Sequence, residues 1–576
     1  MERIVRVNAR SAAIESAPIP ERMAHWGGRE TIARLLTDEV DPGCSALGRG
    51  NKLIFAPGWL GGTAVPMTGR LSVGAKSPLT GGIKESNVGG EAGQRLARAG
   101  VHALVIEDTP DEPEPRVLWI GRETARWIDD LLLARCRVRE SLARLRERFG
   151  ERCGYLVIGP AGEYCMSGAG VATTDASGVQ VRYAGRGGLG AVMGSKGIKA
   201  IVIDDEGEGP LAGDDPARLR DASRRFTEMI LANPGLENRR KFGTSSIVGP
   251  ANELGLLPTL NFSRGSFEGI DGITGQRLAE TIAARGGDGK SGTPCMSGCV
   301  IRCSNVFPDA SGQRKVASLQ YENIALLGSN CGIGTLDGIA ELNGRCNDIG
   351  LDAIEMGCAL GVAMEAGLVR FGDVDGAAAL LDQVGEATPL GRIIGQGAAF
   401  TGQALGVRRV PTVRGQGIPG YDPRALKGNG VTYSTSPMGA DHTAGNAYGT
   451  ARTLDPLSGE GQLENSRALQ IRGTILDMSG LCLFARGPFA EDAELLAELV
   501  NGRFGTDIAF ARIAETSAEI LDVERRFNDS AGVPDRLTDV PEFMRYEPLP
   551  PHNTVYDISV ETMQQIWEIE PNRTKF

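Results

Sequence analysis

The sequence predicts an α+β protein of several domains, in which a β-rich N-terminal domain is followed by two mostly helical domains. The chain has 576 residues, more than an ordinary domain of ~100–200 residues and enough for about three. Up to about residue 204, short apolar runs alternate with turn residues, which is typical of β-sheets. Beyond residue 215, apolar residues recur at helical spacing. We place the domains at residues 1–207, 208–425 and 426–576.

The predicted strands of the first domain are five apolar runs bounded by Gly, Pro, Asp or Asn. They are KLIFAPG (52–58), HALVIED (102–108), RVLWIG (116–121), YLVIGPAG (155–162) and KAIVID (199–204). The first long helix is predicted to begin at Asp215-Pro216, because Asp caps helices well and Pro is favoured in the first turn. The segment 413–435 is rich in Gly and Pro and marks the second boundary. Helices are again predicted over 491–504 and 515–529.

Composition excludes several classes of function. The chain is 41% hydrophobic and 23% charged, as in globular enzymes. Its formal net charge of -11 argues against generic nucleic-acid binding, which needs a basic face. No run approaches the ~18–20 apolar residues of a membrane span, and the first residues lack the apolar core of a signal peptide. We therefore expect a cytoplasmic protein without a membrane span.

Eleven cysteines are present, and three of them form a group. Cys295, Cys299 and Cys303 in TPCMSGCVIRC would span ~12 Å on a straight helix, at ~1.5 Å per residue, so a shared ligand requires a loop. Pro294 begins that loop, and Cys482 after a glycine turn is a plausible fourth ligand. Three grouped cysteines and one remote one favour an iron–sulfur cluster over a Cys₄ zinc site or ordinary buried cysteines.

Two similar turns follow predicted helices in the two helical domains. A helix opening at Thr335 ends at NDIGLD (347–352), and the second turn is DMSGLC (477–482). Gly350 is suited to a helix C-terminus, and Asp352 with Glu355 predicts a capping box for the next helix. The turns can be plain helical corners, but they also present backbone groups and a carboxylate suited to a polar heterocycle.

Glycine is abundant, with 80 residues, about twice the usual ~7%. Glycine-rich segments at 56–70, 85–93 and 183–201 carry Arg70, Asn87 and Arg186. The third segment fits a dinucleotide fingerprint poorly, because DASGVQVRY before it is a weak strand and GSKGIKAIVI runs quickly into another strand. Loops that bind phosphates through backbone N–H groups, with an Arg clamp, fit the pattern better.

Together these motifs resemble the aldehyde:ferredoxin oxidoreductase family, tungsten- or molybdenum-pterin enzymes with one 4Fe–4S cluster. The resemblance runs from GGR (27–29) to the helices after Cys482, and its most specific parts are AGRGGLGAVMGSK, the cysteine triplet and the two turns. It implies a β-rich domain that forms a base for two pterins, with two helical domains closing over them. It also implies a Mg²⁺ ion that joins the pterin phosphates.

The resemblance assigns a role to each motif residue. Cys295, Cys299, Cys303 and Cys482 would bind the cluster; Arg70, Asn87, Val88 and Gly89 one pterin-phosphate region; Arg186 and Gly187 the other; and Asn347, Asp352, Asp477 and Leu481 the pterin rings. Arg70 would also lie between the cluster and a pterin.

Two further residues match active-site positions of the family. Glu322 in LQYENIALLG would be a general base, and His442 in MGADHTAG would donate a hydrogen bond to the substrate carbonyl. Glu322 can otherwise be a plain carboxylate at a helix N-terminus, and His442 a surface-loop residue. Glu341 falls on a cofactor-facing position, or is a solvated helix residue.

The implied function is oxidation of a small aldehyde to a carboxylic acid with water as oxygen source, with ferredoxin or a ferredoxin-like subunit accepting the electrons. Alternatives are another two-electron reaction on the same cofactor (2-hydroxyacid/2-oxoacid interconversion or benzoyl-CoA-type ring reduction), an electron carrier without pterin, and a zinc-stabilised structural protein. The chain departs from the family in the first Cys spacing, in Asn347 where Asp is usual, and in Ala444 after His442. These departures weaken the transfer of a substrate. A homo- or hetero-oligomer is compatible with all of these functions.

Overall fold

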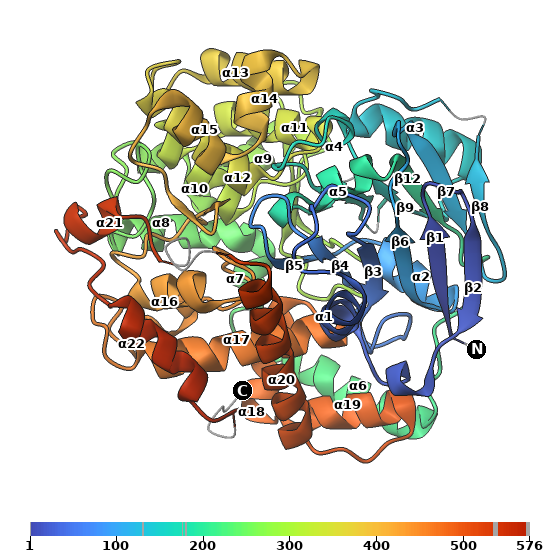
Figure 1. Ribbon diagram of the computed structural model, residues 1–576. Helices are drawn as coiled ribbons and strands as arrows, with labels where there is room; N and C mark the ends of the chain where they lie inside the picture. The colour runs from blue at the N-terminus through green and yellow to red at the C-terminus, as the bar shows by residue number, and fades with distance from the viewer. Residues whose placement is uncertain (1, 130–131, 176, 179–180, 534–538, 572–576) are drawn as a thin grey trace.

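In a computed structural model of the chain (Figure 1), two stacked β-sheets lie beside a larger group of helices. The structure describes residues 2–571 except 130–131, 176, 179–180 and 534–538. The sheets come from the first third of the chain, and most helices come from the remainder.

Each sheet has six strands. The first sheet has the order β2-β1-β6-β3-β4-β5 and the second the order β11-β10-β9-β12-β7-β8. In each sheet one pair is parallel, β1 with β6 and β12 with β7, and the other pairs are antiparallel. Their bounds are β1 Arg3–Asn8, β2 Ile14–Pro18, β3 Leu53–Pro57, β4 Leu71–Lys76, β5 Ile83–Val88, β6 Val101–Glu107, β7 Arg116–Ile120, β8 Ala125–Ile128, β9 Gly154–Val157, β10 Val171–Thr174, β11 Val181–Ala184 and β12 Ile198–Ile203.

Apolar side chains point to both faces of the strands, which explains why the sheets stack. On β3, Leu53 and Phe55 enter the core between the two sheets, whereas Ile54 and Ala56 enter the core on the opposite face. Successive side chains of a strand point to opposite faces, and here both faces are covered. The outer face of the second sheet packs on α3 (Val138–Phe149), and that of the first on α1 (Gly28–Glu39) and C-terminal helices.

The remaining elements are mainly helices. They are α2 Ala92–Arg98, α4 Pro160–Glu163, α5 Leu189–Ser195, α6 Pro216–Leu231, α7 Leu236–Phe242, α8 Val248–Glu253, α9 Gly275–Arg285, α10 Tyr321–Leu327, α11 Leu336–Ile349, α12 Ala353–Glu365, α13 Val374–Glu386, α14 Pro389–Gly395, α15 Ala398–Leu405, α16 Lys427–Thr435, α17 Gln462–Ser479, α18 Arg486–Glu491, α19 Glu494–Phe504, α20 Phe510–Ser530, α21 Phe543–Tyr546 and α22 Val560–Gln564. Short strands complete the chain: β13 Lys290–Thr293, β14 Ser304–Pro308, β15 Arg314–Val316, β16 Thr412–Val413 and β17 Gln416–Gly417.

The C-terminal helices return to the first sheet. Helices α17 and α20 pack on α1, and α19 packs on α6, so the chain's first and last thirds share one core. In Figure 1, the red α20 lies next to the blue α1. Helix α6 begins at Asp215-Pro216, as predicted, with the Asp215 side chain accepting from the Arg218 N–H. It lies in the predicted domain 208–425 but packs on α19 of the predicted domain 426–576.

The local predictions are confirmed with one correction. All five predicted strand runs contain strands, and helices lie at both predicted C-terminal positions. Asp352 caps α12, but the predicted capping box with Glu355 is wrong. Glu355 is fully buried and instead accepts from the N–H groups of Ala398 and Gly417, because a distant segment packs over this helix.

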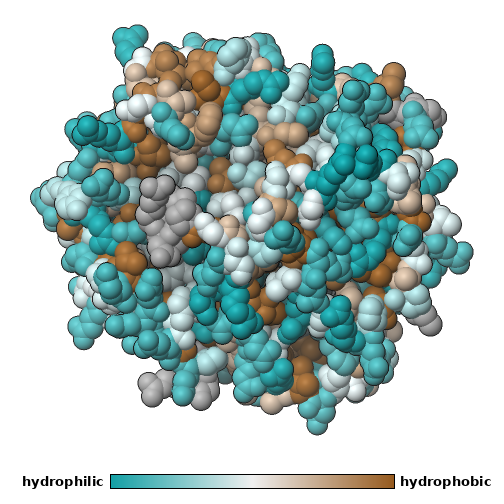
Figure 2. Space-filling model, in the orientation of Figure 1, coloured by the Kyte–Doolittle hydropathy of each residue, from teal (hydrophilic) through white to brown (hydrophobic). Residues whose placement is uncertain are grey.

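The surface in Figure 2 is mainly hydrophilic, with apolar side chains gathered over α13–α15 at the upper left. Within the part of the chain that the structure describes, no helix combines the length and apolar character needed to cross a bilayer.

Candidate active site

Two adjoining cavities lie where the sheets meet the helices. Cavity A has a volume of about 290 Å³ and cavity B about 410 Å³. They share the side chains of Asn87, Glu322 and His442 as parts of their walls. Strand β5, helix α10 and the loop before α17 therefore bring residues of all three predicted domains to one place.

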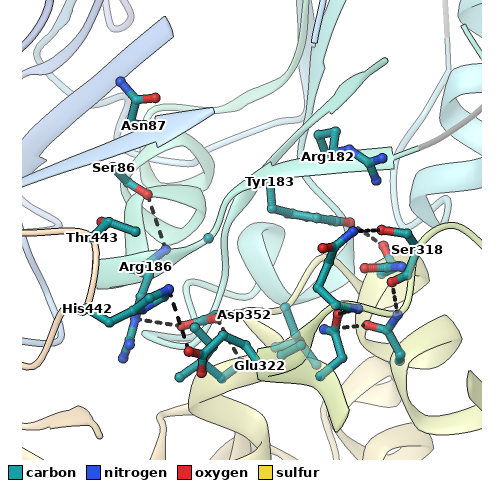
Figure 3. A pocket seen from close by; sticks show the side chains of 18 of the residues that line it. Ser86, Asn87, Arg182, Tyr183, Arg186, Ser318, Glu322, Asp352, His442 and Thr443 are labelled. Carbon is teal, nitrogen blue, oxygen red and sulfur yellow. Dashed lines mark hydrogen bonds and ion pairs between the residues drawn. The ribbon is translucent and has the colours of Figure 1, made fainter. Parts of the chain in front are cut away.

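Glu322 and His442 face each other at this junction (Figure 3). Glu322 lies in the first turn of α10, which begins after the capping residue Gln320. Its Oε2 accepts a 2.7 Å hydrogen bond from the Gly420 N–H, and its Oε1 lies 3.6 Å from His442 Nε2. Glu322 Oε1 and His442 Nδ1 are buried without a hydrogen-bond partner. Burial raises the pKa of Glu322, although His442 lowers it.

Aromatic side chains form the wall next to this pair. The Tyr421 ring lies 6.0 Å from the His442 ring, 4.8 Å from Tyr321 and 5.9 Å from Tyr448, between centroids. Tyr321 donates a hydrogen bond to the Gly420 carbonyl. A carboxyl group beside such a wall loses hydration, which is why its pKa rises.

A buried ion pair holds the loop that carries His442. Lys84 on β5 is fully buried, and its Nζ lies 2.7 Å from Asp441 Oδ2 and donates to the Met438 carbonyl. Asp441 Oδ1 also accepts from the Thr443 N–H at 3.0 Å. Burial opposes the charge of Asp441, yet Lys84 and other cations hold its pKa well below the usual range. Sequence reasoning missed Lys84 because its partner is 357 residues away.

Arg186 occupies the inner end of cavity A, directly after β11. Its Nε lies 3.2 Å from Asp352 Oδ2, and its Nη2 donates to the Gly417 carbonyl at 2.6 Å. Arg186 Nε and Nη1 and Asp352 Oδ2 have no hydrogen-bond partner despite burial. Asn347 lines the same cavity, and its carbonyl accepts from the Tyr183 hydroxyl.

Gly187 is required by its surroundings. Its φ is +83°, and an added Cβ would lie 2.4 Å from Lys84 Cγ. Any side chain here would be strained and would displace the lysine that holds the His442 loop. The glycine-rich segment therefore places Arg186 and allows Lys84 to pass close to the backbone.

Arg70 lies between the strands and the cysteine loop. It donates to Asn87 Oδ1, and its Nη2 donates to the Asn87 carbonyl at 3.0 Å. A Cβ at Gly89 would lie 3.4 Å from both Arg70 Nη1 and Cys295 Sγ. Val88 is buried beside them. This segment, 87–89, thus brings a guanidinium group next to one cysteine of the predicted cluster.

The four predicted cluster cysteines lie together. The segment 294–302 is not helical, as predicted. A hydrogen bond with Cys299 and burial raise the pKa of Cys295, and burial together with Cys295 and Cys482 raises the pKa of Cys303 to about 12. Cys482 follows the turn after α17, and its N–H donates to the Met67 carbonyl.

The number of these cysteines matches the ligand set of a 4Fe–4S cluster, which needs four thiolates. Among the described residues, no group of three or more His, Cys, Asp or Glu side chains converges on a position for a single metal ion. A zinc site needs its sulfurs about 2.3 Å from one ion, whereas a 4Fe–4S cluster bonds each cysteine to a different iron. Cys295, Cys299, Cys303 and Cys482 are close enough to affect one another's pKa, as the ligands of one cluster would be.

Asp477 and Leu481 line cavity B near Cys482. Helix α17 ends at Gly480, which adopts the left-handed conformation, as Gly350 does after α11. Burial raises the pKa of Asp477 to about 6 although Arg29 lies 3.4 Å away. The two matching turns thus end at different cavities, one at A and one at B.

Glu341 does not join the other predicted residues. It lines neither cavity, is 39% exposed in its side chain, and pairs with Lys315 at 2.9 Å and with Arg345. The alternative of a solvated helix residue describes its position in the structure.

Both cavities suit a large polar ligand. Arg186, Asp352, Glu322 and His442 have buried polar atoms that make no hydrogen bond, although Arg186 lies in an ion pair with Asp352 and Glu322 in one with His442, and all four residues line cavity A. Buried polar groups are otherwise nearly always hydrogen-bonded, so these atoms fit a ligand with many donors and acceptors. A pterin is a ligand of this kind.

Comparison with known proteins gives a consistent result. Sequence models for the N-terminal domain and for domains 2 and 3 of aldehyde ferredoxin oxidoreductase match residues 4–205 and 221–567. Tungsten-containing aldehyde ferredoxin oxidoreductases of Pyrococcus furiosus and Pyrococcus abyssi are 31% and 32% identical to the chain, over 95% of it and 92% of each relative. The active-site complex of a benzoyl coenzyme A reductase with 1,5-dienoyl-CoA has the same fold, with a TM-score of 0.78 at 17% identity, over 98% of this chain and 92% of the other.

Proposed function

The chain belongs to the aldehyde ferredoxin oxidoreductase family, and from this premise we propose that it oxidises aldehydes to carboxylic acids. Water would supply the oxygen atom, and a 4Fe–4S cluster held by the cysteines would accept the two electrons. The observation that carries the proposal is the Glu322–His442 pair at the junction of two polar cavities.

Glu322 acts as the general base toward water or the aldehyde hydrate. Its Oε1 is unpartnered and faces the junction, while the Gly420 N–H holds Oε2 in place. Burial raises its pKa, and a base is most effective when its pKa approaches the working pH. One oxygen is therefore anchored and the other is available for a proton.

His442 donates a hydrogen bond to the substrate carbonyl oxygen, where negative charge develops. The Lys84–Asp441 ion pair fixes the loop on its N-terminal side, so the imidazole is held before the substrate binds. Tyr421 limits the space around the carbonyl carbon and excludes water from that side.

The residues that would hold the cofactors are those of the two cavities and the cysteine loop. Arg186, Asn347 and Asp352 in cavity A suit one pterin, and Asp477 and Leu481 in cavity B suit the other. Tungsten or molybdenum bound by these pterins supplies the two-electron chemistry. Backbone oxygens near the pterin phosphates would bind Mg²⁺.

The cysteine loop and Cys482 would hold the cluster that carries electrons away. Cys295 lies beside Arg70, which contacts Asn87 in the wall of both cavities. This places a cation between the cavities and the cluster ligands. Ferredoxin or a ferredoxin-like subunit would accept the electrons, in a homo- or hetero-oligomer.

The test is aldehyde-dependent reduction of a viologen dye by protein purified anaerobically. The expected result is stoichiometric carboxylic acid containing oxygen from isotopically labelled water. Turnover of a 2-hydroxyacid or of benzoyl-CoA, with none of any aldehyde, would assign the site to the other two-electron reactions instead.

A further inference from the structure

Two arginine side chains in cavity B have no anionic partner among the residues that the structure describes. Arg239 on α7 and Arg486 at the start of α18 both line this cavity, which also contains Glu322 and His442. Neither guanidinium group makes an ion pair or a hydrogen bond with any residue that the structure describes, and Arg239 Nη1 is buried. The Arg239 guanidinium instead lies 4.4 Å from the ring centroid of Phe484.

The same arginines lie where cavity B meets a third cavity. Cavity C, of about 240 Å³, is lined by Arg239, Phe484 and Arg486 together with the turn before α7. A molecule passing between cavities B and C would therefore meet both guanidinium groups. Glycine at position 449 makes room for one of them, since a Cβ there would lie 3.0 Å from Arg486 Nη2.

The two cations repel each other in the free protein. Burial and the neighbouring Arg239 lower the pKa of Arg486. The acidic residues of cavity B lie next to other cationic side chains: Asp477 is 3.4 Å from Arg29, and Glu322 is 3.6 Å from His442. An anion between Arg239 and Arg486 would relieve this repulsion through charge-assisted hydrogen bonds.

Aromatic rings connect this cationic site to the proposed catalytic pair. Tyr421 lies beside His442, Tyr448 lies beside Tyr421, and the next residue, Gly449, contacts Arg486. The intervening surface suits a hydrocarbon chain or ring. A substrate that reached from His442 to Arg486 would thus be apolar in the middle and polar at both ends.

We propose that the substrate is an aldehyde with a second, anionic group, such as a carboxylate, that Arg239 and Arg486 bind while the carbonyl reaches Glu322 and His442. This inference rests on the proposed function, and it adds the substrate class. The pterin phosphates are expected near Arg70 and Arg186, so they do not account for these two arginines.

The test compares two aldehydes of the same shape, para-carboxybenzaldehyde and cuminaldehyde, whose second groups are a carboxylate and an isopropyl group. Binding of the corresponding acids, terephthalate and cuminate, is measured by calorimetry on the holoenzyme, so that a readout independent of turnover exists. We expect the wild type to prefer the carboxylate member of each pair. Arg239→Gln and Arg486→Gln should each weaken that preference by about 10- to 100-fold, the effect of losing a hydrogen bond to a charged group.

Lys241→Gln is the matched control, because it removes an exposed charge from α7 outside the three cavities, and it should leave the preference unchanged. Arg486→Lys should restore part of the preference that Arg486→Gln loses.

Equal binding of both acids by the wild type, or an unchanged preference in both Gln variants, would overturn the inference. A changed cluster spectrum in Arg239→Gln with an unchanged preference would show that these cations serve the cluster. If no aldehyde is oxidised, the proposed function fails, and acid binding still decides the role of the arginines.

Discussion

Replacing Glu322 with Gln removes the proposed base while keeping its shape. In the structure one carboxylate oxygen accepts from the Gly420 N–H at 2.7 Å, and the other lies 3.6 Å from His442 Nε2. An amide can keep its oxygen on Gly420 and turn its NH₂ group toward His442. The variant should therefore fold and retain its cofactors.

The expected loss follows from the chemistry of the side chain. General base catalysis contributes about 10²–10⁴-fold, which corresponds to about 3–5 kcal/mol of activation free energy at ~1.4 kcal/mol per tenfold. Glu322→Gln should lower kcat by this factor. Because the group acts in the reaction and not in substrate binding, KM should change far less.

The assay is viologen reduction with a saturating aldehyde under anaerobic conditions, together with metal content per chain and Tm. Equal metal content and Tm would show that the loss arises at the carboxylate. A Glu322→Gln enzyme with full metal content and kcat within about twofold of wild type would refute the base assignment.

Three further outcomes are expected. His442→Gln removes the group that lowers the pKa of Glu322, so the acid limb of the pH profile of kcat/KM should move to higher pH. An unmoved limb would show that His442 does not affect the pKa of the catalytic base. Cys482→Ser should reduce the iron content and bleach the cluster absorption, while the protein still folds. Full iron content would exclude Cys482 as a ligand. Lys84→Met leaves the buried Asp441 carboxylate unpaired and should cost about 3–5 kcal/mol of stability near neutral pH. That cost should shrink as acid protonates Asp441, because Lys84 holds its pKa low only in the folded state; a Tm equal to that of wild type would contradict this.

Sequence predicted best where the signal is local. The glycines at 350 and 480 end their helices in the left-handed conformation, and Pro294 precedes a segment that is not helical. Such features depend on the backbone preferences of a few adjacent residues. The family resemblance then assembled them into one site, and Glu322, His442, Asn347 and Asp352 do line adjoining cavities.

Contacts between distant segments were not predictable in this way. Glu355 has the spacing of a capping box, but it turns toward Ala398 and Gly417 because the chain folds back over α12. No local sequence motif identifies Lys84, Tyr421 or the arginine pair of cavity B. Glu341 matched a position in the family and lies in a surface ion pair instead.

The domain boundaries show the same limit. The composition changes near residues 207 and 425, yet α6 packs on α19 and α20 packs on α1. Domains assigned as continuous ranges of sequence do not describe a core to which the first and last thirds of the chain both contribute.

The most direct test of the account is the metal content of the anaerobically purified protein, with W, Mo, Fe and Zn counted per chain. About one W or Mo and about four Fe are predicted, because the two cavities that we propose as pterin sites adjoin four grouped cysteines. Iron without W or Mo, after expression in a host that makes the pterin, would indicate an electron carrier. Zinc alone would contradict the account.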